Sequence, residues 1–328
     1  MTKIVGIGNA LVDVLALLKD ETLLSDAKLV KGGMTLIDDG QQHILREMMT
    51  GLDVRKSTGG SACNAVLALA NLGTRVGFVG KVGSDELGRF FEENCHHVGI
   101  DARLMHTERP TGVANTFISP DGERTFGTCL GAAASMEASD ITPDLFEGAG
   151  ILHIEGYLVQ NHELMEAICR AGKASGAQLS IDLASYNVVA TDLPFFRHLV
   201  SDYMDIVFAN EEESAAFTEG KAPADALREI AGMGCLAIVK QGSRGAAAME
   251  GSEEASVAAH HVPVVDTTAA GDFFAGGFLH AYAKGASLAQ CLQTGATLGE
   301  HIIGVVGTQL SDTTWDNIRE TVGEILNP

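Results

Sequence analysis

Short runs of β-branched and apolar residues alternate along this chain with longer stretches of helical pattern, and this alternation limits the fold more than any other feature. The strand-like runs lie at residues 5–7, 76–79, 150–154, 179–181, 205–208 and 236–239. The helix-like stretches lie at residues 62–72, 86–98, 162–174, 211–217 and 224–233. Strands that alternate with helices favour a mostly parallel sheet covered by helices on both faces. We therefore expect an α/β fold.

Glycines follow several of the helical stretches, at Gly73, Gly99, Gly176 and Gly234, and we expect left-handed C-terminal caps there. The chain has 328 residues, of which 46% are hydrophobic, and this is enough for a large core. No internal repeat or long linker divides it. We expect a single folded unit.

Two stretches, 17–39 and 102–128, interrupt this rhythm. They carry strand-like alternation at 34–37 and 113–118, with glycine- and proline-containing turn signals and no intervening helix. We interpret them as a small antiparallel sheet inserted as a lid into a body made of residues 1–16, 40–101 and 129–328. The alternative, that they are only surface hairpins, is equally compatible with the pattern.

The formal charge is −21, from 43 acidic and 22 basic residues. A surface this acidic repels phosphate backbones, so we expect no nucleic acid or anionic membrane as a partner. The same charge disfavours a small anion such as ATP. If the chain binds one, local groups must hold the phosphates.

Six cysteines lie far apart without a C-x-x-C pair, which is typical of reduced, buried thiols in a cytoplasmic protein. The apolar start of the chain, residues 4–18, is interrupted by glycine and polar residues, and no apolar run reaches the length of a membrane span. We expect a buried strand there and a cytoplasmic location. No cluster of histidine and cysteine predicts a structural metal site.

The run from Asp266 to Asp272 precedes an apolar helical stretch that ends at Lys284-Gly285. We expect residues 262–266 to form a short strand and the helix to start at Asp272. Unpaired backbone N–H groups at a helix start bind anions, and small residues let a phosphate approach closely. Asp272 could accept a proton there. Taken alone, a cap on the helix is the simpler role for Asp272.

Four other segments carry polar groups suited to ligands. Gly59-Gly-Ser-Ala-Cys-Asn64 predicts a turn whose backbone can touch a polyol, and Asn9 and Asp13 suit vicinal hydroxyls. Asn210 and Glu213 share a helix face and could hold the water shell of magnesium. The segment 242–245 follows a strand at a sheet edge where ligands bind. In isolation, an ordinary loop and a strand end are the simpler explanations of the first two segments, and an acidic helix start explains the third at least as well.

Three common motifs are missing. The run Gly6-Ile-Gly8-Asn-Ala-Leu11 lacks the third glycine of a dinucleotide-binding turn. The chain contains neither a P-loop nor a G-x-S-x-G nucleophile elbow. A dinucleotide enzyme, a P-loop kinase and a serine hydrolase are therefore disfavoured.

Taken in order, these segments resemble the ribokinase (PfkB-type) carbohydrate kinase family over essentially the whole chain, and the adenosine kinase-like branch in particular. The motifs of the family are at 59–64, 210–213, 242–245 and 266–272. Fragments that favour the adenosine kinase branch are at 8–13, 109–112, 130–134, 204–211 and 272–278. The resemblance implies a three-layer α/β/α sandwich with a small β-sheet lid.

The resemblance also implies a role for each matching residue. Asp272 would be the general base, with the N–H groups of Ala269, Ala270 and Gly271 as the anion hole. The sugar hydroxyls would be held by Asn9, Asp13, Gly60, Ser61 and Asn64, and Tyr157 would stack on a purine. The nucleotide would be held by Asn210, Gly242, Ser243, Gly245 and the lid residue Arg124. Magnesium would be bound by Asn210 and Glu213, through water.

One departure concerns Ala269, which stands where the family usually has glycine. If the backbone there needs a positive φ, alanine costs about 1 kcal/mol. A second concerns residues 304–310, which match only loosely the segment that binds a monovalent cation in relatives, so potassium dependence stays open.

The function implied is ATP-dependent transfer of the γ-phosphate to a primary hydroxyl of a nucleoside or sugar, with adenosine as the first candidate. The alternative substrates are ribose, fructose and 2-keto-3-deoxygluconate. A catalytically silent nucleotide- or sugar-binding regulator is the non-enzyme alternative. Monomer and homodimer are both compatible with the sequence.

Overall fold

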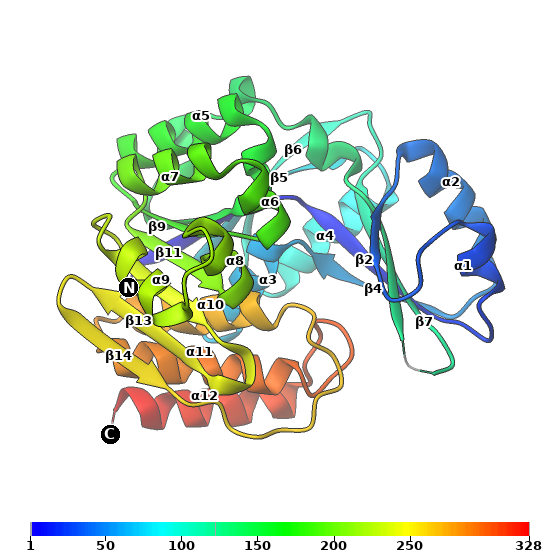
Figure 1. Ribbon diagram of the computed structural model, residues 1–328. Helices are drawn as coiled ribbons and strands as arrows, with labels where there is room; N and C mark the ends of the chain where they lie inside the picture. Colours follow the sequence, from blue (N-terminus) through cyan, green and yellow to red (C-terminus); the bar gives the residue numbers. More distant parts are fainter. Residues whose placement is uncertain (1, 122, 328) are drawn as a thin grey trace.

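A nine-stranded sheet forms the centre of the computed structural model, which describes residues 2–121 and 123–327 (Figure 1). Its strand order is β14-β13-β12-β11-β10-β9-β1-β5-β6. The strands are β1 (Lys3–Ile7), β5 (Val76–Gly83), β6 (Asp101–Thr107), β9 (Ala149–Glu155), β10 (Gln178–Asp182), β11 (Ile206–Asn210), β12 (Leu236–Lys240), β13 (Ala246–Glu250) and β14 (Glu253–Val257). Only β13 and β14 run antiparallel to their neighbours. The expected α/β fold with a mostly parallel sheet is confirmed.

Helices cover both faces of this sheet. One face carries α3 (Ser61–Asn71), α4 (Glu86–His97), α10 (Ala270–Tyr282) and α11 (Leu288–Ile302). The other carries α5 (His162–Ala174), α6 (Tyr186–Thr191), α7 (Leu193–Asp202), α8 (Glu211–Phe217) and α9 (Pro223–Ala231). Strand alternation separates the two cores, since Ile4 lies in the first and its neighbour Val5 in the second.

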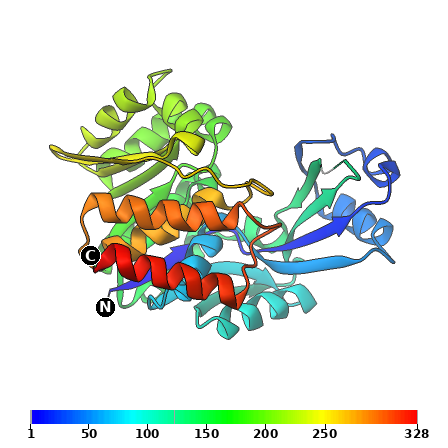
Figure 2. The same cartoon turned by 90° about the horizontal axis from the view of Figure 1, so that it is seen from below.

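The last helix, α12 (Asp312–Leu326), forms an additional layer outside α10 and α11 (Figure 2). Trp315 of α12 packs on Phe273 of α10, and with Leu298 and Ile302 of α11 these residues form a third apolar cluster. Since Phe273 follows Asp272 directly, this cluster anchors the first turns of α10 in the body of the protein.

Glycine caps were predicted correctly at four helix ends. Gly73, Gly99, Gly176 and Gly234 have φ of +80°, +79°, +83° and +97°. One expected strand is wrong. Residues 262–266 have no regular structure, because the N–H groups of Val265 and Asp266 both donate to the carbonyl of Ile303 rather than to a strand.

The small sheet lies to one side of the body, in the order β3-β8-β7-β2-β4 (Figure 1). Its strands are β2 (Leu11–Leu17), β3 (Met34–Leu36), β4 (Val54–Gly59), β7 (Gly112–Ile118) and β8 (Arg124–Cys129). Two helices, α1 (Thr22–Asp26) and α2 (Asp39–Met48), pack on one face, where Leu24 and Leu45 join the apolar cluster that holds Val12, Val14 and Phe117. The opposite face of the sheet carries Asp13.

Three strands of the small sheet, β3, β7 and β8, come from the expected stretches 17–39 and 102–128. The small sheet also includes β2 and β4, whereas β6 pairs with β5 in the large sheet. At the edge of the large sheet, most residues of β6 are only partly buried, so its pattern resembles that of a hairpin strand. The pairing of β2 with β7 is parallel, which an insertion of hairpins alone does not give.

Short 3₁₀ turns complete the structure, at Gly131–Ser135, Ala138–Asp140, Pro143–Phe146, Gly156–Gln160 and Gly242–Arg244. In the described part of the chain, no helix has the length and apolar character needed to cross a membrane.

Candidate active site

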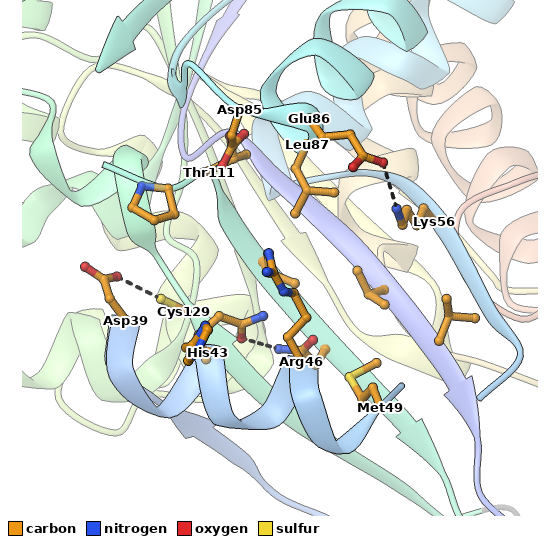
Figure 3. Close-up of a pocket in the computed structure, with 16 residues that line it drawn as sticks. Asp39, His43, Arg46, Met49, Lys56, Asp85, Glu86, Leu87, Thr111 and Cys129 are labelled. Carbon is orange, nitrogen blue, oxygen red and sulfur yellow. Dashed lines mark hydrogen bonds and ion pairs between the residues drawn. The ribbon is translucent and has the colours of Figure 1, made fainter. Parts of the chain in front are cut away.

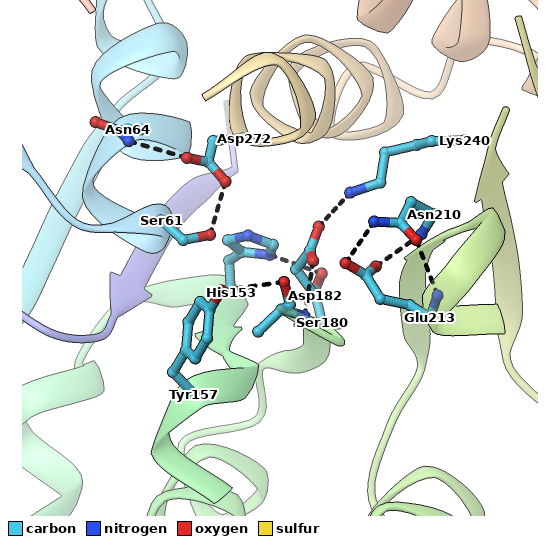
Figure 4. A network of polar contacts seen from close by, with 11 residues as sticks. Ser61, Asn64, His153, Tyr157, Ser180, Asp182, Asn210, Glu213, Lys240 and Asp272 are labelled. Carbon is cyan, nitrogen blue, oxygen red and sulfur yellow. Dashed lines mark hydrogen bonds and ion pairs between the residues drawn. The ribbon is translucent and has the colours of Figure 1, made fainter. Parts of the chain in front are cut away.

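Polar side chains gather where the parallel strands of the large sheet end. Glu155, Asp182, Asn210 and Lys240 are the last residues of β9, β10, β11 and β12, and Asn9 follows β1 closely. The carboxyl ends of parallel strands are the usual ligand-binding edge of an open α/β sheet. In this protein the N-terminus of α10 lies at the same edge (Figure 4).

Asp272 is the third residue of α10, which begins two residues earlier than expected. Its carboxylate accepts a hydrogen bond from Ser61 Oγ at 2.7 Å and one from Asn64 Nδ2 at 2.9 Å (Figure 4). Ala269 occupies the N-cap position of α10, so Asp272 is not the N-cap residue of this helix. Burial raises the pKa of Asp272 to about 6, although the two hydrogen bonds favour its charged form.

The turn before α10 has the shape of an anion-binding loop. Ala269 has φ of +61°, in the left-handed region, as its position requires. The N–H groups of Gly271 and Asp272 donate to no described carbonyl. A Cβ added to Gly271 would lie 3.0 Å from Lys240 Nζ. These N–H groups are therefore available to an anion at the positive end of the helix dipole.

Two glycines bring the chain close to Asp13 and Asn9. A Cβ on Gly59 would lie 2.2 Å from Asp13 Oδ1, and one on Gly60, whose φ is +96°, would lie 2.1 Å from the carbonyl oxygen of Asn9. Burial, reinforced by the charge of Asp272, raises the pKa of Asp13 to about 7. The charge of Asp272 therefore acts on the carboxyl group of Asp13.

Glu155 orders the neighbouring backbone. It accepts a hydrogen bond from Asn9 Nδ2 at 2.5 Å and one from the N–H of Ala62 at 3.3 Å. Burial raises the pKa of Glu155 to about 7.

The amide oxygen of Asn64 is available to a ligand. Asn64 Oδ1 is buried and has no hydrogen-bond partner among the described residues, so it can accept a hydrogen bond from a ligand.

Tyr157 follows β9 and lies close to this cluster (Figure 4). Its hydroxyl donates a hydrogen bond to the carbonyl of Ala184 at 3.3 Å. Burial and the charges of Glu155 and Asp272 raise its pKa to about 12. The ring therefore lies at the same edge of the sheet as Ser61 and Asp182 (Figure 4).

Asn210 and Glu213 bind each other at the start of α8. Asn210 donates to Glu213 from its backbone N–H and from Nδ2, each at 2.7 Å, and accepts from the N–H of Glu213 at 2.8 Å. Burial raises the pKa of Glu213 to about 7. Asn210 and Glu213 therefore cap the start of α8, in agreement with the alternative that this segment is an ordinary acidic helix start. No cluster of three potential metal ligands occurs among the described residues, so any magnesium contact here fits only through water.

The turn at Gly242, Ser243 and Gly245 lies at the carboxyl end of β12, beside Lys240. Gly242 and Gly245 have φ of +55° and +100°, and a Cβ on Gly245 would lie 1.9 Å from the carbonyl oxygen of Val257. The turn is largely exposed, and no described contact joins it to Asp272. It forms the outer margin of the site.

Arg124, at the start of β8, connects the small sheet to the anion loop. Its guanidinium forms an ion pair with Asp266. Asp266 is buried and also accepts hydrogen bonds from the N–H groups of Thr268 at 2.8 Å and Gly307 at 2.7 Å. An arginine of the expected lid thus reaches the loop that precedes Asp272.

A cavity of about 420 Å³ lies on the other face of the small sheet, between α2 and the start of α4 (Figure 3). Asp39 and Arg46 line it from α2, and Asp85 and Thr111 from the opposite side. Val14 lines this cavity, whereas its neighbour Asp13 points to the opposite face. None of the expected site residues lies in it.

Three residues of the site were not predicted, namely Glu155, Asp182 and Lys240. Each is a single charged residue at the end of an apolar strand, and it belongs to no motif. Strand position was the available signal, because the last residues of parallel strands meet at the ligand-binding edge.

Known proteins with similar sequences and structures are kinases. The model of the pfkB family of carbohydrate kinases matches residues 27–315. A fructokinase of Vibrio alginolyticus is 30% identical over 68% of this chain and 76% of its own. The structure titled adenosine kinase from Sinorhizobium meliloti is 31% identical, with a TM-score of 0.85 over 98% of this chain and 99% of its own. A probable sugar kinase of Rhizobium etli is 30% identical, with a TM-score of 0.86 over the same shares. The chain therefore belongs to the pfkB family of carbohydrate kinases.

Proposed function

We propose that this protein transfers the γ-phosphate of ATP to a primary hydroxyl of a nucleoside or sugar. Members of its family are phosphotransferases that act on hydroxyl groups. The observation that carries the proposal is the placement of Asp272. Its carboxylate is held by Ser61 and Asn64 beside the unpaired N–H groups at the start of α10. A base and an anion-binding turn therefore lie within one helical turn of each other.

Asp272 acts as the general base. It accepts the proton of the acceptor hydroxyl as the oxygen attacks the γ-phosphorus in line, while the bond from that phosphorus to the oxygen of ADP breaks. Ser61 and Asn64 keep the carboxylate oriented. With a pKa of about 6, the Asp272 carboxyl is charged at neutral pH and close to the range in which a base works well.

The free N–H groups of Ala269, Gly271 and Asp272 stabilise the charge on the phosphoryl oxygens. The N–H of Ala270, which was expected to join them, donates to the carbonyl of Thr267 at 3.3 Å. ATP enters as its magnesium complex, and Asn210 and Glu213 contact the water shell of that ion. Arg124 reaches the site from the small sheet, where it pairs with Asp266, and Gly242, Ser243 and Gly245 border the nucleotide. These local groups compensate for the overall charge of −21.

Adenosine is the first candidate acceptor. Asn9, Asp13, Gly60, Ser61 and Asn64 form the polar part of the acceptor site, and Asp13 and Asn64 suit vicinal hydroxyls. Tyr157 supplies an aromatic face for a purine base. A free sugar is the second candidate, because relatives of similar identity include a fructokinase and a probable sugar kinase. All six cysteines are buried and free, which agrees with work in the reducing cytoplasm.

A screen of acceptors tests the proposal. The purified protein is incubated with Mg·ATP and, separately, with adenosine, inosine, ribose, fructose or 2-keto-3-deoxygluconate, and ADP and the phosphorylated product are measured. We expect product with adenosine. Product with a free sugar and none with adenosine would reverse the ranking of substrates. ATP binding without product from any acceptor would favour a catalytically silent binding protein. Replacing potassium by sodium in the same assay shows whether a monovalent cation is needed.

A further inference from the structure

Lys240 lies on the active-site face of the large sheet. It is the last residue of β12, and it shares a face of that strand with Ile238, which packs in the core under α10. Its side chain is 14% exposed. Asp182, at the end of β10, and Asn210, at the end of β11, point to the same region (Figure 4). The ammonium is therefore held at the strand ends and not in solvent.

The ammonium group lies against the anion loop. Lys240 Nζ donates a hydrogen bond to Asp182 Oδ2 at 2.6 Å, which uses one of its three N–H donors. The position of a Cβ on Gly271 would be 3.0 Å from Nζ. Lys240 Nζ and the free N–H groups of the first turn of α10 thus border the same space, and both suit an anion.

The charges near Lys240 favour an anion-binding role for this residue over a purely structural one. The carboxylates of Asp182, Glu213 and Asp272 all influence Lys240. Burial opposes the charge on Lys240, but these carboxylates outweigh it and raise the pKa of the ammonium group. A buried ion pair alone adds little stability. Asp182 contacts the ammonium directly, and Glu213 and Asp272 add negative charge near it, so the site would repel a triphosphate more strongly without this cation.

We propose that Lys240 is a further catalytic residue, whose ammonium group contacts the phosphoryl group as it is transferred. This inference rests on the proposed function. The acceptor oxygen forms its bond to the γ-phosphorus, the electron pair of the breaking bond leaves with ADP, and the acceptor proton passes to Asp272. Lys240 keeps its protons and donates hydrogen bonds to the phosphoryl oxygens as their charge changes. Asp182 positions the ammonium for this contact.

Lys240→Met tests the contact, because methionine keeps the length of the chain and removes the charge. We expect kcat to fall about 100-fold, the loss typical of one donor to a developing charge, while KM for the acceptor stays unchanged. Lys81→Met is the matched control. Lys81 forms a half-buried ion pair with Asp140 at 2.8 Å, outside the described site, and its loss should leave kcat near that of the wild type. A kcat for Lys240→Met equal to that of the control would overturn the inference.

Folding is checked by thermal melting. Lys240→Met leaves the Asp182 carboxylate without its partner, and this could unfold the single variant. The double variant Asp182→Asn, Lys240→Met removes that charge and still lacks the ammonium group. We expect it to melt near the wild type and to retain the loss of kcat. Recovery of wild-type turnover in the double variant would show that Lys240 only neutralises Asp182.

A binding measurement separates this inference from the proposed function. Calorimetry compares the affinity for Mg·ADP with and without aluminium fluoride, which mimics the phosphoryl group in transfer and needs no identified acceptor. We expect fluoride to tighten binding in the wild type and much less in Lys240→Met. An equal gain in both proteins contradicts the role of Lys240, even where the acceptor screen succeeds. A screen without product contradicts the proposed function alone.

Discussion

Ala269, in the turn before α10, has a left-handed backbone conformation. Its φ of +61° is one of four positive values at non-glycine positions among the described residues. Such a conformation costs an L-residue about 1 kcal/mol or more, and it persists where the surrounding structure or a function requires it. The strain expected from alanine at this position is therefore present in the fold.

Ala269→Gly should remove this strain. We expect the free energy of unfolding, measured with urea, to rise by up to about 1 kcal/mol. Ala270→Gly is the matched control, since the neighbouring alanine packs on the same cluster but has helical backbone, and it should lose up to about 1 kcal/mol. Equal effects at the two positions would mean that the left-handed conformation carries no cost.

Motif residues were easier to predict than isolated ones. Asp272, Ser61 and Asn64 were found by their motifs, yet their mutual hydrogen bonds join positions more than 200 residues apart, and no local pattern encodes such contacts. Glu155 and Lys240 were not predicted, because a charged residue at the end of an apolar strand is usually one that solvent covers. Only the register of neighbouring strands brings these ends together.

Among the elements, the connection from β4 to α3 positions the residues that we propose to bind the acceptor. Gly60 is the N-cap of α3, with φ of +96°, and its Cα faces the carbonyl of Asn9. Gly59 leaves room for the carboxylate of Asp13. Three segments, the end of β1, the start of β2 and the start of α3, approach each other only because these positions lack side chains.

Gly60→Ala should lower the free energy of unfolding by more than the positive φ of Gly60 alone explains. Gly73→Ala is the control, because Gly73 has φ of +80° and no atom within 4 Å of an added Cβ. We expect Gly73→Ala to lose about 1 kcal/mol of unfolding free energy. Gly60→Ala should lose about 1 to 3 kcal/mol more, from the contact with Asn9. Urea titration measures both, and equal losses would contradict the close approach of the two segments.

Elements in the interior of the large sheet could be predicted from sequence, and those at its margins could not. The strands β9 to β12 are largely buried on both faces, and β9, β11 and β12 contain runs of consecutive apolar residues. The edge strand β6 carries a weaker pattern and was assigned to the insertion. Residues 262–266 have the composition of a strand but lie beside no strand, so only the tertiary structure determines their conformation.

At the scale of the whole molecule, the small sheet and the body meet at the site. β2 leaves the end of β1 after three residues and carries Asp13, and Arg124 of β8 pairs with Asp266 in the body. The backbone N–H groups and the cations that we propose to bind the phosphates lie there. The existence of a small sheet was predictable, but its parallel pairing of β2 with β7 was not, because that register depends on segments about 100 residues apart.

The proposed base, Asp272, can be removed with little change in the shape of its side chain. Asp272→Asn keeps the size of the side chain and an oxygen for Ser61, but the amide cannot take the acceptor proton. Steady-state kinetics with the acceptor from the screen should show kcat lower by about 100- to 10,000-fold, with the affinity for Mg·ATP unchanged by calorimetry. Asp316→Asn, an exposed position on α12, serves as the control and should turn over normally. Near-normal turnover by Asp272→Asn would contradict the account.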